Sequence, residues 1–190
     1  MAYFPAFLDL KKKRTLIIGG GKIAGDKLEH MLDFTTDITV IAPKITPRVQ
    51  ELAAKHSLTL HRRPYQRGDC KGYFIVIVAV DDIEVQKAVW QECQEVGALC
   101  NAVDSVEYCD FIYPSYIKEG DMVIAFSSGG ASPSLSKYLR RAIQKLLPQD
   151  LADFVTELRK LRQSLPKGRE RMQLLDTKAK AYIDKHFKDR

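Results

Sequence analysis

The sequence predicts an α/β fold in which a parallel sheet comes first and helices follow. Short, continuously apolar runs alternate with helical patterns up to about residue 104, which is typical of strands buried on both faces of a sheet. A glycine-rich turn, Gly19–Gly21, joins the first apolar run to the first helical pattern, and from Asp150 onward only helical spacing is found. These observations predict a Rossmann-like parallel sheet followed by a C-terminal helical domain.

The first half of the chain alternates regularly between expected strands and expected helices. The predicted strands before the centre of the sheet are Thr15–Ile18, Ile38–Ala42 and Leu58–Arg62. The predicted helices run from Lys22 to Asp33, from Pro47 to Lys55 and from Glu84 to Val96, with apolar residues at helical spacing.

The most apolar run, Tyr73–Val80, is predicted to be the central strand, and a shorter strand, Leu99–Asp104, follows it. Ligands of open α/β sheets bind beyond the carboxyl ends of the strands, so Val80 and Asp81 are expected near a cofactor. Asp104 lies at another carboxyl end. The residues alone leave two interpretations of Asp104: it acts on a ligand, or it caps the end of the strand.

The rest of the chain predicts a strand pair and three helices. The expected strands are Asp110–Pro114 and Met122–Phe126, and the expected helices are Ser134–Leu147, Asp150–Gln163 and Arg169–Phe187. Between them, the loop Ser127–Pro133 is small, polar and rich in N–H donors, with Ser132 as an N-cap and Pro133 at the first helical position. Such a loop suits a carboxylate, although a turn and cap would also account for Ser132 and Pro133.

The glycine turn fits the pattern G-x-G-x-x-A at Gly19, Gly21 and Ala24. Gly19 allows a tight strand-to-helix turn, Gly21 lets a pyrophosphate approach the backbone, and Ala24 lets the helix lie close to the strand. The alternative is a glycine-rich turn with no ligand. The second strand ends in Pro43 and Lys44 instead of an acidic residue, so the residues by themselves leave NAD and NADP open.

Composition narrows the class of protein. The 190 residues carry a net charge of +6, but residues 137–190 hold 15 Lys and Arg against 7 Asp and Glu. That surplus can attract a polyanion, or it can be a solvated helical face. No apolar run is long enough for a membrane span, and neither a signal peptide nor a nucleic-acid-binding motif is recognisable. We therefore expect a cytoplasmic protein that binds neither membrane nor nucleic acid.

The cysteines and histidines predict no metal site. The cysteines form no C-x-x-C pair and are expected to be reduced thiols, and the histidines are scattered, so we expect no metal ligands among them. The residues concerned are Cys70, Cys93, Cys100, Cys109, His30, His56, His61 and His186.

A set of motifs in fixed order resembles one family. The motifs are Gly19–Ala24, Ala42-Pro43, Ala79–Asp82, Asn101–Asp104 and Ser127–Pro133. Their order and spacing are similar to those of the precorrin-2 dehydrogenase / sirohydrochlorin ferrochelatase family, which includes a module of siroheme synthase. The resemblance covers about residues 3–147.

This resemblance implies an NAD-binding Rossmann domain at 1–112, a dimerisation segment with the Ser/Gly loop at 113–147 and a small helical domain at 148–190. It also implies a homodimer that oxidises precorrin-2 to sirohydrochlorin with NAD⁺. Some family members also insert Fe²⁺ to give siroheme. The alternative is a non-catalytic regulatory module that binds a nucleotide or a tetrapyrrole. Its signature would be loss of the carboxylate at position 104, which this chain retains.

The resemblance also assigns roles to particular positions. Asp104 is the expected catalytic residue. The expected substrate contacts are Asn101, Ser128, Gly129 and Gly130. The expected cofactor contacts are Gly19, Gly21, Lys22, Ile23, Ala24, Pro43, Lys44 and Val80. Val80 departs from the threonine that is common in the family.

Overall fold

The computed structural model describes residues 3–187, which form two compact units divided between Ile112 and Tyr113. Within the first unit, five strands form one parallel sheet in the order β3-β2-β1-β4-β5. The strands are β1 (Thr15–Ile18), β2 (Ile38–Ile41), β3 (Thr59–His61), β4 (Ile75–Val78) and β5 (Leu99–Ala102). This order is that of a Rossmann half with two further strands on the other side. The predicted Rossmann-like sheet is confirmed.

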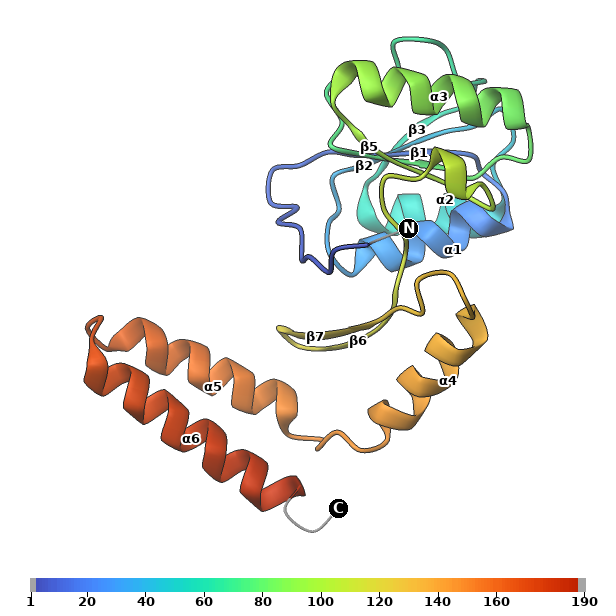
Figure 1. Cartoon of the computed structure of the whole chain (residues 1–190). Helices are drawn as coiled ribbons and strands as arrows, with labels where there is room; N and C mark the ends of the chain where they lie inside the picture. The colour runs from blue at the N-terminus through green and yellow to red at the C-terminus, as the bar shows by residue number, and fades with distance from the viewer. Residues whose placement is uncertain (1–2, 188–190) are drawn as a thin grey trace. The chain divides into compact units, whose positions relative to one another are not determined.

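Helices cover both faces of this sheet (Figure 1). Helices α1 (Lys22–Leu32) and α2 (Pro47–His56) lie on one face, and α3 (Ile83–Val96) lies on the other. The central strands β1 and β4 are buried along their whole length, so their side chains contact helices on both sides. Each fully buried Ile, Leu or Val contributes roughly 1.5–3 kcal/mol to folding, which makes this pair of strands the centre of the core.

The register of the sheet brings the carboxyl ends of four strands to one level. Ile18 pairs with both Ile41 and Val78, and Val78 pairs with Ala102. The segments that follow these four residues therefore leave the sheet along one edge. Because the chain crosses over between β1 and β4, this edge contains the switch point at which such sheets bind ligands.

The loop between β3 and β4 is held by a buried carboxylate on α3. Glu92 is only 2% exposed and accepts hydrogen bonds from Tyr65 Oη (2.5 Å), the Gly68 amide (2.9 Å) and the Cys70 amide (2.8 Å). Burial on its own would raise the pKa of Glu92, but these bonds together hold that pKa below its usual value. The loop therefore depends on the ionised form of this side chain.

Glu92→Gln is expected to lower the free energy of unfolding by about 2–4 kcal/mol, because an amide would face donors that need an acceptor. The pKa of Glu92 is lower in the folded protein than in the unfolded chain, where it is near 4.5. Its ionised form therefore stabilises the fold at pH values above 4.5, and this stabilisation is lost as the pH falls through the pKa of the folded protein. The difference between wild type and variant should therefore shrink below about pH 4.5. Urea titrations across pH 3–7 measure it, and the exposed Glu95→Gln, which should cost under about 1 kcal/mol, is the control. Equal stability of wild type and Glu92→Gln at pH 7 would contradict the argument.

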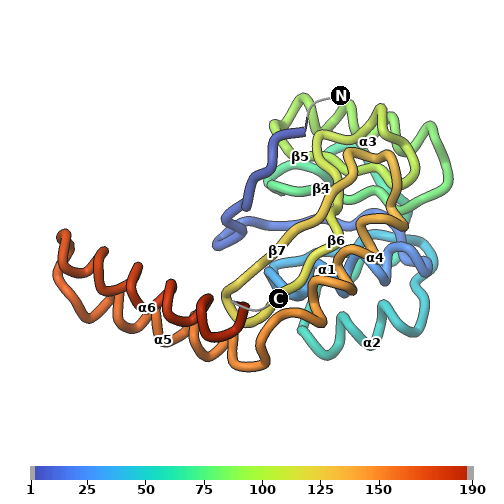
Figure 2. The backbone as a smooth tube through the Cα atoms, turned by 60° about the horizontal axis from the view of Figure 1, so that its bottom comes forward, coloured from blue at the N-terminus to red at the C-terminus, as the bar shows by residue number. Residues whose placement is uncertain are grey.

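The second unit consists of a hairpin and helices. Strands β6 (Ser115–Glu119) and β7 (Met122–Phe126) pair antiparallel, and α4 (Pro133–Gln144) packs on them. Helices α5 (Leu151–Ser164) and α6 (Arg169–Phe187) lie side by side in Figure 2. Phe154 and Tyr182 stack between them with ring centroids 3.9 Å apart. No helix among the described residues is both long and apolar enough to cross a membrane.

The predicted strand Asp110–Pro114 is wrong, because the strand begins only at Ser115. One backbone bond and two side-chain bonds tie the predicted segment to β5 instead. Asp110 exchanges hydrogen bonds with Cys100, through its amide and its carboxylate, and the Asn101 amide donates to the Phe111 carbonyl at 2.8 Å. Strand β5 also ends before its predicted end, so Asp104 lies in a turn and not in the strand. Apolar patterning does not distinguish a segment with such scattered bonds from a strand.

Candidate functional site

The glycine turn after β1 is packed against two other strand ends. Gly19 has φ +124°, and a Cβ there would lie 2.2 Å from the carbonyl oxygen of Ala79, which follows β4. A Cβ on Gly20 would lie 2.3 Å from the carbonyl oxygen of Lys44, in the loop after β2. The Thr46 amide donates to the Gly20 carbonyl at 2.9 Å. Only glycines allow these three segments to meet so closely.

Gly21, by contrast, faces open space. A Cβ at this position would meet nothing within 4 Å. Gly21 is the N-cap of α1 and makes no side-chain cap, so the first amides of the helix are left for another acceptor. Ala24 is buried one turn later. An open backbone beside an uncapped helix N-terminus fits a bound pyrophosphate, so the residues present suit a dinucleotide.

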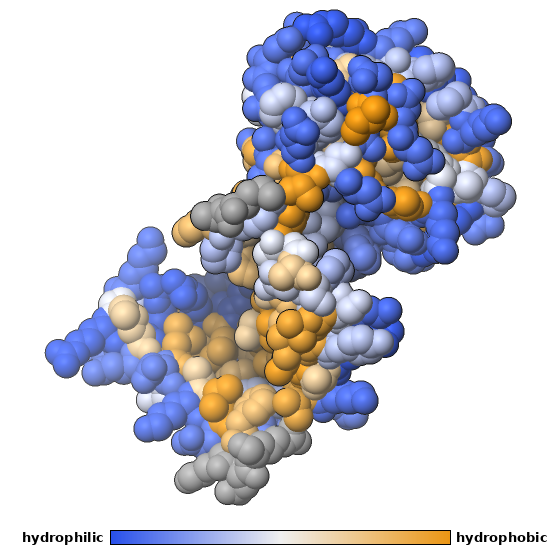
Figure 3. All heavy atoms as spheres, turned by 45° about the vertical axis from the view of Figure 1, so that its right-hand side comes forward, coloured by the Kyte–Doolittle hydropathy of each residue, from blue (hydrophilic) through white to orange (hydrophobic). Residues whose placement is uncertain are grey.

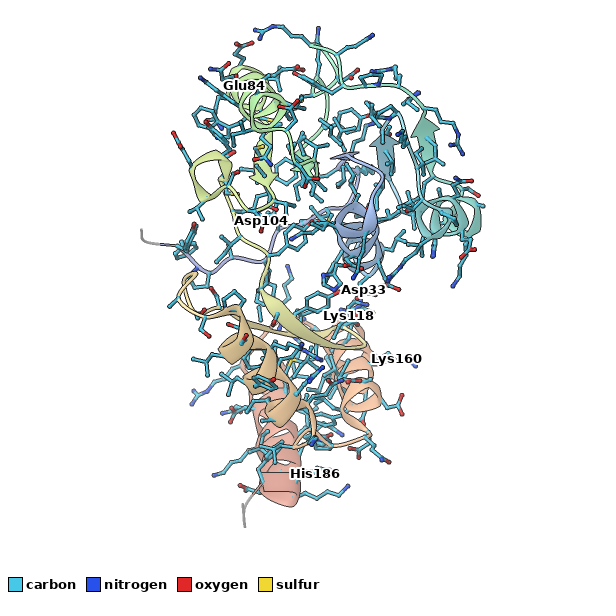
Figure 4. All side chains as sticks on the ribbon, turned by 90° about the vertical axis from the view of Figure 1, so that its right-hand side faces the viewer. Asp33, Glu84, Asp104, Lys118, Lys160 and His186 are labelled. Carbon is cyan, nitrogen blue, oxygen red and sulfur yellow. The ribbon has the colours of Figure 1, made fainter. Side chains whose placement is uncertain are left out.

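A cavity of about 190 Å³ lies beside this turn. It contains three of the predicted site residues, Ile23, Val80 and Asp104, and Figure 4 labels Asp104 on the loop after β5. Its lining comes from the starts of α1 and α3 and from the segments that follow β4 and β5. It is made by Ile23, Ala79, Val80, Asp81, Ile83, Gln86, Val103, Asp104 and Ser105. The structure thus brings two of the predicted cofactor contacts, Ile23 and Val80, and the predicted catalytic carboxylate of Asp104 to one cavity.

Asp104 has an unusual backbone. Its φ is +61°, in the left-handed region that non-glycine residues seldom adopt and Asn and Asp tolerate best. Asp104 is exposed. The residue before it, Val103, donates its amide to the Val78 carbonyl at 2.9 Å. A left-handed residue next to a cavity is where strained backbone often serves function. Its role on a ligand remains a prediction.

Lys27 on α1 is a charged neighbour that the sequence analysis did not select. Burial lowers the pKa of Lys27, while the nearby Cys109 and Asp104 groups favour its charged form. An ammonium group therefore lies within electrostatic range of the Asp104 carboxylate. The sequence could have indicated Lys27 through its position, since it lies one helical turn after Ile23 on the same face of α1.

The other predicted cofactor residues lie at the same edge of the sheet. Lys22 is exposed at the start of α1, and Pro43 and Lys44 are exposed in the loop that contacts Gly20. Asn101 does not line the cavity. It is buried, and its Nδ2 donates to the Phe111 carbonyl and, at 3.5 Å, to Cys109 Sγ. Its substrate role remains a prediction, whereas its bonds hold the chain after β5.

The Ser/Gly loop lies in the second unit, beside a separate cavity of about 260 Å³. Ser128 lines this cavity, and its Oγ accepts from the Ser132 amide at 2.9 Å. Gly129 and Gly130 follow with positive φ, and Ser132 caps α4 through the Leu135 amide at 3.2 Å. The predicted N-cap is confirmed. The remaining lining residues are Ala125, Phe126, Ser127, Leu135, Ser136 and Leu139.

Comparisons with known proteins agree with this geometry. The chain is 37% identical to a siroheme synthase of Pseudoalteromonas atlantica over 80% of the chain and 33% of that protein. It is 37% identical to one of Methylococcus capsulatus over 90% of the chain and 37% of that protein. The chain thus spans about a third of the length of these relatives.

A solved structure has the same fold. SirC, a precorrin-2 dehydrogenase, superposes with a TM-score of 0.79 at 27% identity, over 92% of this chain and 88% of that one. These similarities confirm the resemblance stated from the motifs. Residues 6–115 match the model of a family described as "Putative NAD(P)-binding". That match covers more than half of the chain and includes the glycine turn and Asp104, so the protein belongs to this NAD(P)-binding family.

Proposed function

We propose that the protein oxidises precorrin-2 to sirohydrochlorin with NAD⁺ in siroheme biosynthesis. The observation that carries the proposal is the cavity in which Ile23 and Val80, beside the dinucleotide turn, meet the Asp104 carboxylate. The similarity to SirC and to siroheme synthases supports the same reaction. A regulatory module that only binds ligands would not need a carboxylate at this position.

The reaction assigns a task to each part of the site. The Gly21 backbone and the first turn of α1 would hold the pyrophosphate, with Lys22, Pro43 and Lys44 around it. When bound, the nicotinamide ring supplies a hydride acceptor. Precorrin-2 loses two electrons and a proton as that hydride, and a second proton must also leave. The Asp104 carboxylate takes this second proton and passes it to water.

The substrate carries many carboxylates, and two features of the chain suit such a polyanion. The Ser/Gly loop offers amides next to the N-terminus of α4, and residues 137–190 carry the basic surplus. Within the proposal, Ser128, Gly129 and Gly130 bind substrate carboxylates.

The proposal includes a cytoplasmic homodimer. Helix α4 exposes an apolar stripe at Leu135, Tyr138 and Leu139, with 60%, 63% and 46% of these residues accessible. Figure 3 shows apolar side chains gathered on the surface of the unit that begins at residue 113. An exposed stripe of this kind is typical of a surface that another chain covers. Sedimentation of the purified protein tests the dimer.

Insertion of Fe²⁺ into sirohydrochlorin is a second activity that the same carboxylate supports. Metal insertion releases protons from pyrrole nitrogens, and Asp104 lies in an open cavity where it can accept them. Fe²⁺ would then be a substrate. Mixing sirohydrochlorin with Fe²⁺ under anaerobic conditions, with and without the protein, tests this activity.

The decisive assay gives the purified protein precorrin-2 with NAD⁺ or NADP⁺ and follows sirohydrochlorin by absorbance. We expect turnover with NAD⁺, with SirC as the positive control. Absence of turnover while SirC reacts would remove the proposal. Binding of the dinucleotide without turnover would favour the regulatory module.

Ser128→Ala is expected to raise KM for precorrin-2 about 3–10-fold and to leave kcat within about twofold, because a hydroxyl that binds the substrate and the transition state equally contributes uniform binding. The loss of the bond to the Ser132 amide should also cost about 1 kcal/mol of stability. Ser134→Ala, at an exposed position of α4, is the matched control. An unchanged KM would contradict the role of Ser128.

A further inference from the structure

Gln86 is a buried polar residue at the start of α3. It is 4% exposed and lines the 190 Å³ cavity together with Asp104 and Val80. Neither the glycine motif nor the strand-end carboxylates predicted any role for it. Buried amides are almost always hydrogen-bonded, so the partners of Gln86 indicate what it holds in place.

The partners of Gln86 surround the Asp104 turn. Nε2 donates to the Val80 carbonyl at 2.7 Å and to the Val103 carbonyl at 3.3 Å, and Oε1 accepts from the Ser105 hydroxyl. Carbonyl oxygens only accept hydrogen bonds, so the amide must direct its nitrogen toward them. One side chain thus ties both neighbours of Asp104 to the segment after β4.

The two amide hydrogens of Gln86 are both used in these bonds. Gln86 therefore has no hydrogen left to donate to a ligand, although it lies at the cavity wall. The printed bonds of Gln86 all go to the two segments that border the cavity, so the backbone that it holds is its direct route to the reaction. That backbone includes Asp104 at φ +61°, a conformation that persists only where the surroundings impose it.

We propose that Gln86 is a positioning residue that holds the Asp104 carboxylate and sets its distance from the segment that begins at Val80. This inference rests on the proposed function, because that function assigns Asp104 to proton transfer and Val80 to the cofactor. A displacement of about 1 Å can cost about 100-fold in rate, so one lost amide can have a large effect.

The test replaces Gln86 with methionine, which has similar length and apolar stem but no donor. Gln86→Met is expected to lower kcat about 100-fold and to change KM for precorrin-2 less than about threefold. Gln94→Met is the matched control on the same helix, because Gln94 donates to both Asp110 oxygens at 3.1 Å away from the cavity. Its kcat should stay within about twofold of wild type.

A double-mutant cycle separates positioning from general loss of structure. In the Asp104→Asn background, Gln86→Met should lower the residual turnover by less than about twofold, because no catalytic carboxylate remains to be positioned. An equal loss in both backgrounds would overturn the proposal. If Gln86→Met does not fold, Ser105→Ala removes the bond to Oε1 alone, and its kcat should fall about 10-fold with the same dependence on Asp104.

Hydrogen exchange tests the inference separately from the proposed function. If wild type does not oxidise precorrin-2, the function fails, but the Ser105 amide should still exchange at least about 10-fold faster in Gln86→Met than in wild type or Gln94→Met. The amide donates to the Ala102 carbonyl at 3.4 Å, so it reports on the turn. Unchanged exchange would overturn the positioning role whatever the activity.

Discussion

Asp104→Asn is expected to lower kcat for sirohydrochlorin formation by about 10²–10⁴-fold, the usual contribution of a positioned general base. Asparagine keeps the size of the side chain and tolerates the left-handed backbone that Asp104 adopts, but it cannot take a proton as a base. The affinity for NAD⁺ and the melting temperature should therefore change little. Stopped-flow absorbance measures kcat, and calorimetry measures the affinity.

Two further variants sharpen this result. Asp104→Ala should lose the same activity and also about 1 kcal/mol of stability, because the left-handed backbone conformation is less favourable for alanine than for asparagine. Asp153→Asn, an exposed carboxylate on α5, is the control and should leave kcat unchanged. If Asp104→Asn turns over within twofold of wild type, the carboxylate is not the base.

Alanine substitutions at two glycines of the same turn are expected to have different effects, one on NAD⁺ affinity and the other on stability. Gly21→Ala places a methyl group in the open space beside the uncapped helix, where the pyrophosphate is proposed to bind. The dissociation constant for NAD⁺ should rise about 10–100-fold, which is about 1.4–2.8 kcal/mol. Stability should not fall, since φ −81° at this position suits alanine.

Gly19→Ala should instead fail to fold, or lose more than about 3 kcal/mol of stability. Its Cβ would collide with the Ala79 carbonyl oxygen at 2.2 Å, and its φ of +124° is closed to alanine. Thermal unfolding and NAD⁺ titration of both variants separate the two roles. Wild-type affinity in Gly21→Ala would contradict the assignment of this turn to the dinucleotide.

The strands and helices around this turn could be predicted because each depends on local pattern. Apolar runs such as Thr15–Ile18 and Ile75–Val78 are buried on both faces, and their composition alone indicates it. The order of motifs, from Gly19 to Ser128, likewise indicated the family and the candidate carboxylate. The prediction of a strand at Asp110–Pro114 was wrong, because this segment is joined to β5 by one backbone bond and by two side-chain bonds and does not form a continuous ladder.

The sequence by itself determined the alternation of elements, the glycine turn and the acid at position 104, since these follow from residue type and spacing. Only the tertiary structure decided that β4 lies between β1 and β5, and thus that Val80 and Asp104, which follow β4 and β5, line one cavity. It also selected Gln86, Glu92 and Lys27 from many similar residues on helix surfaces. A polar residue in a helical pattern looks the same whether it faces water or a strand end, and only the packing of distant segments decides which carbonyls and charges it meets.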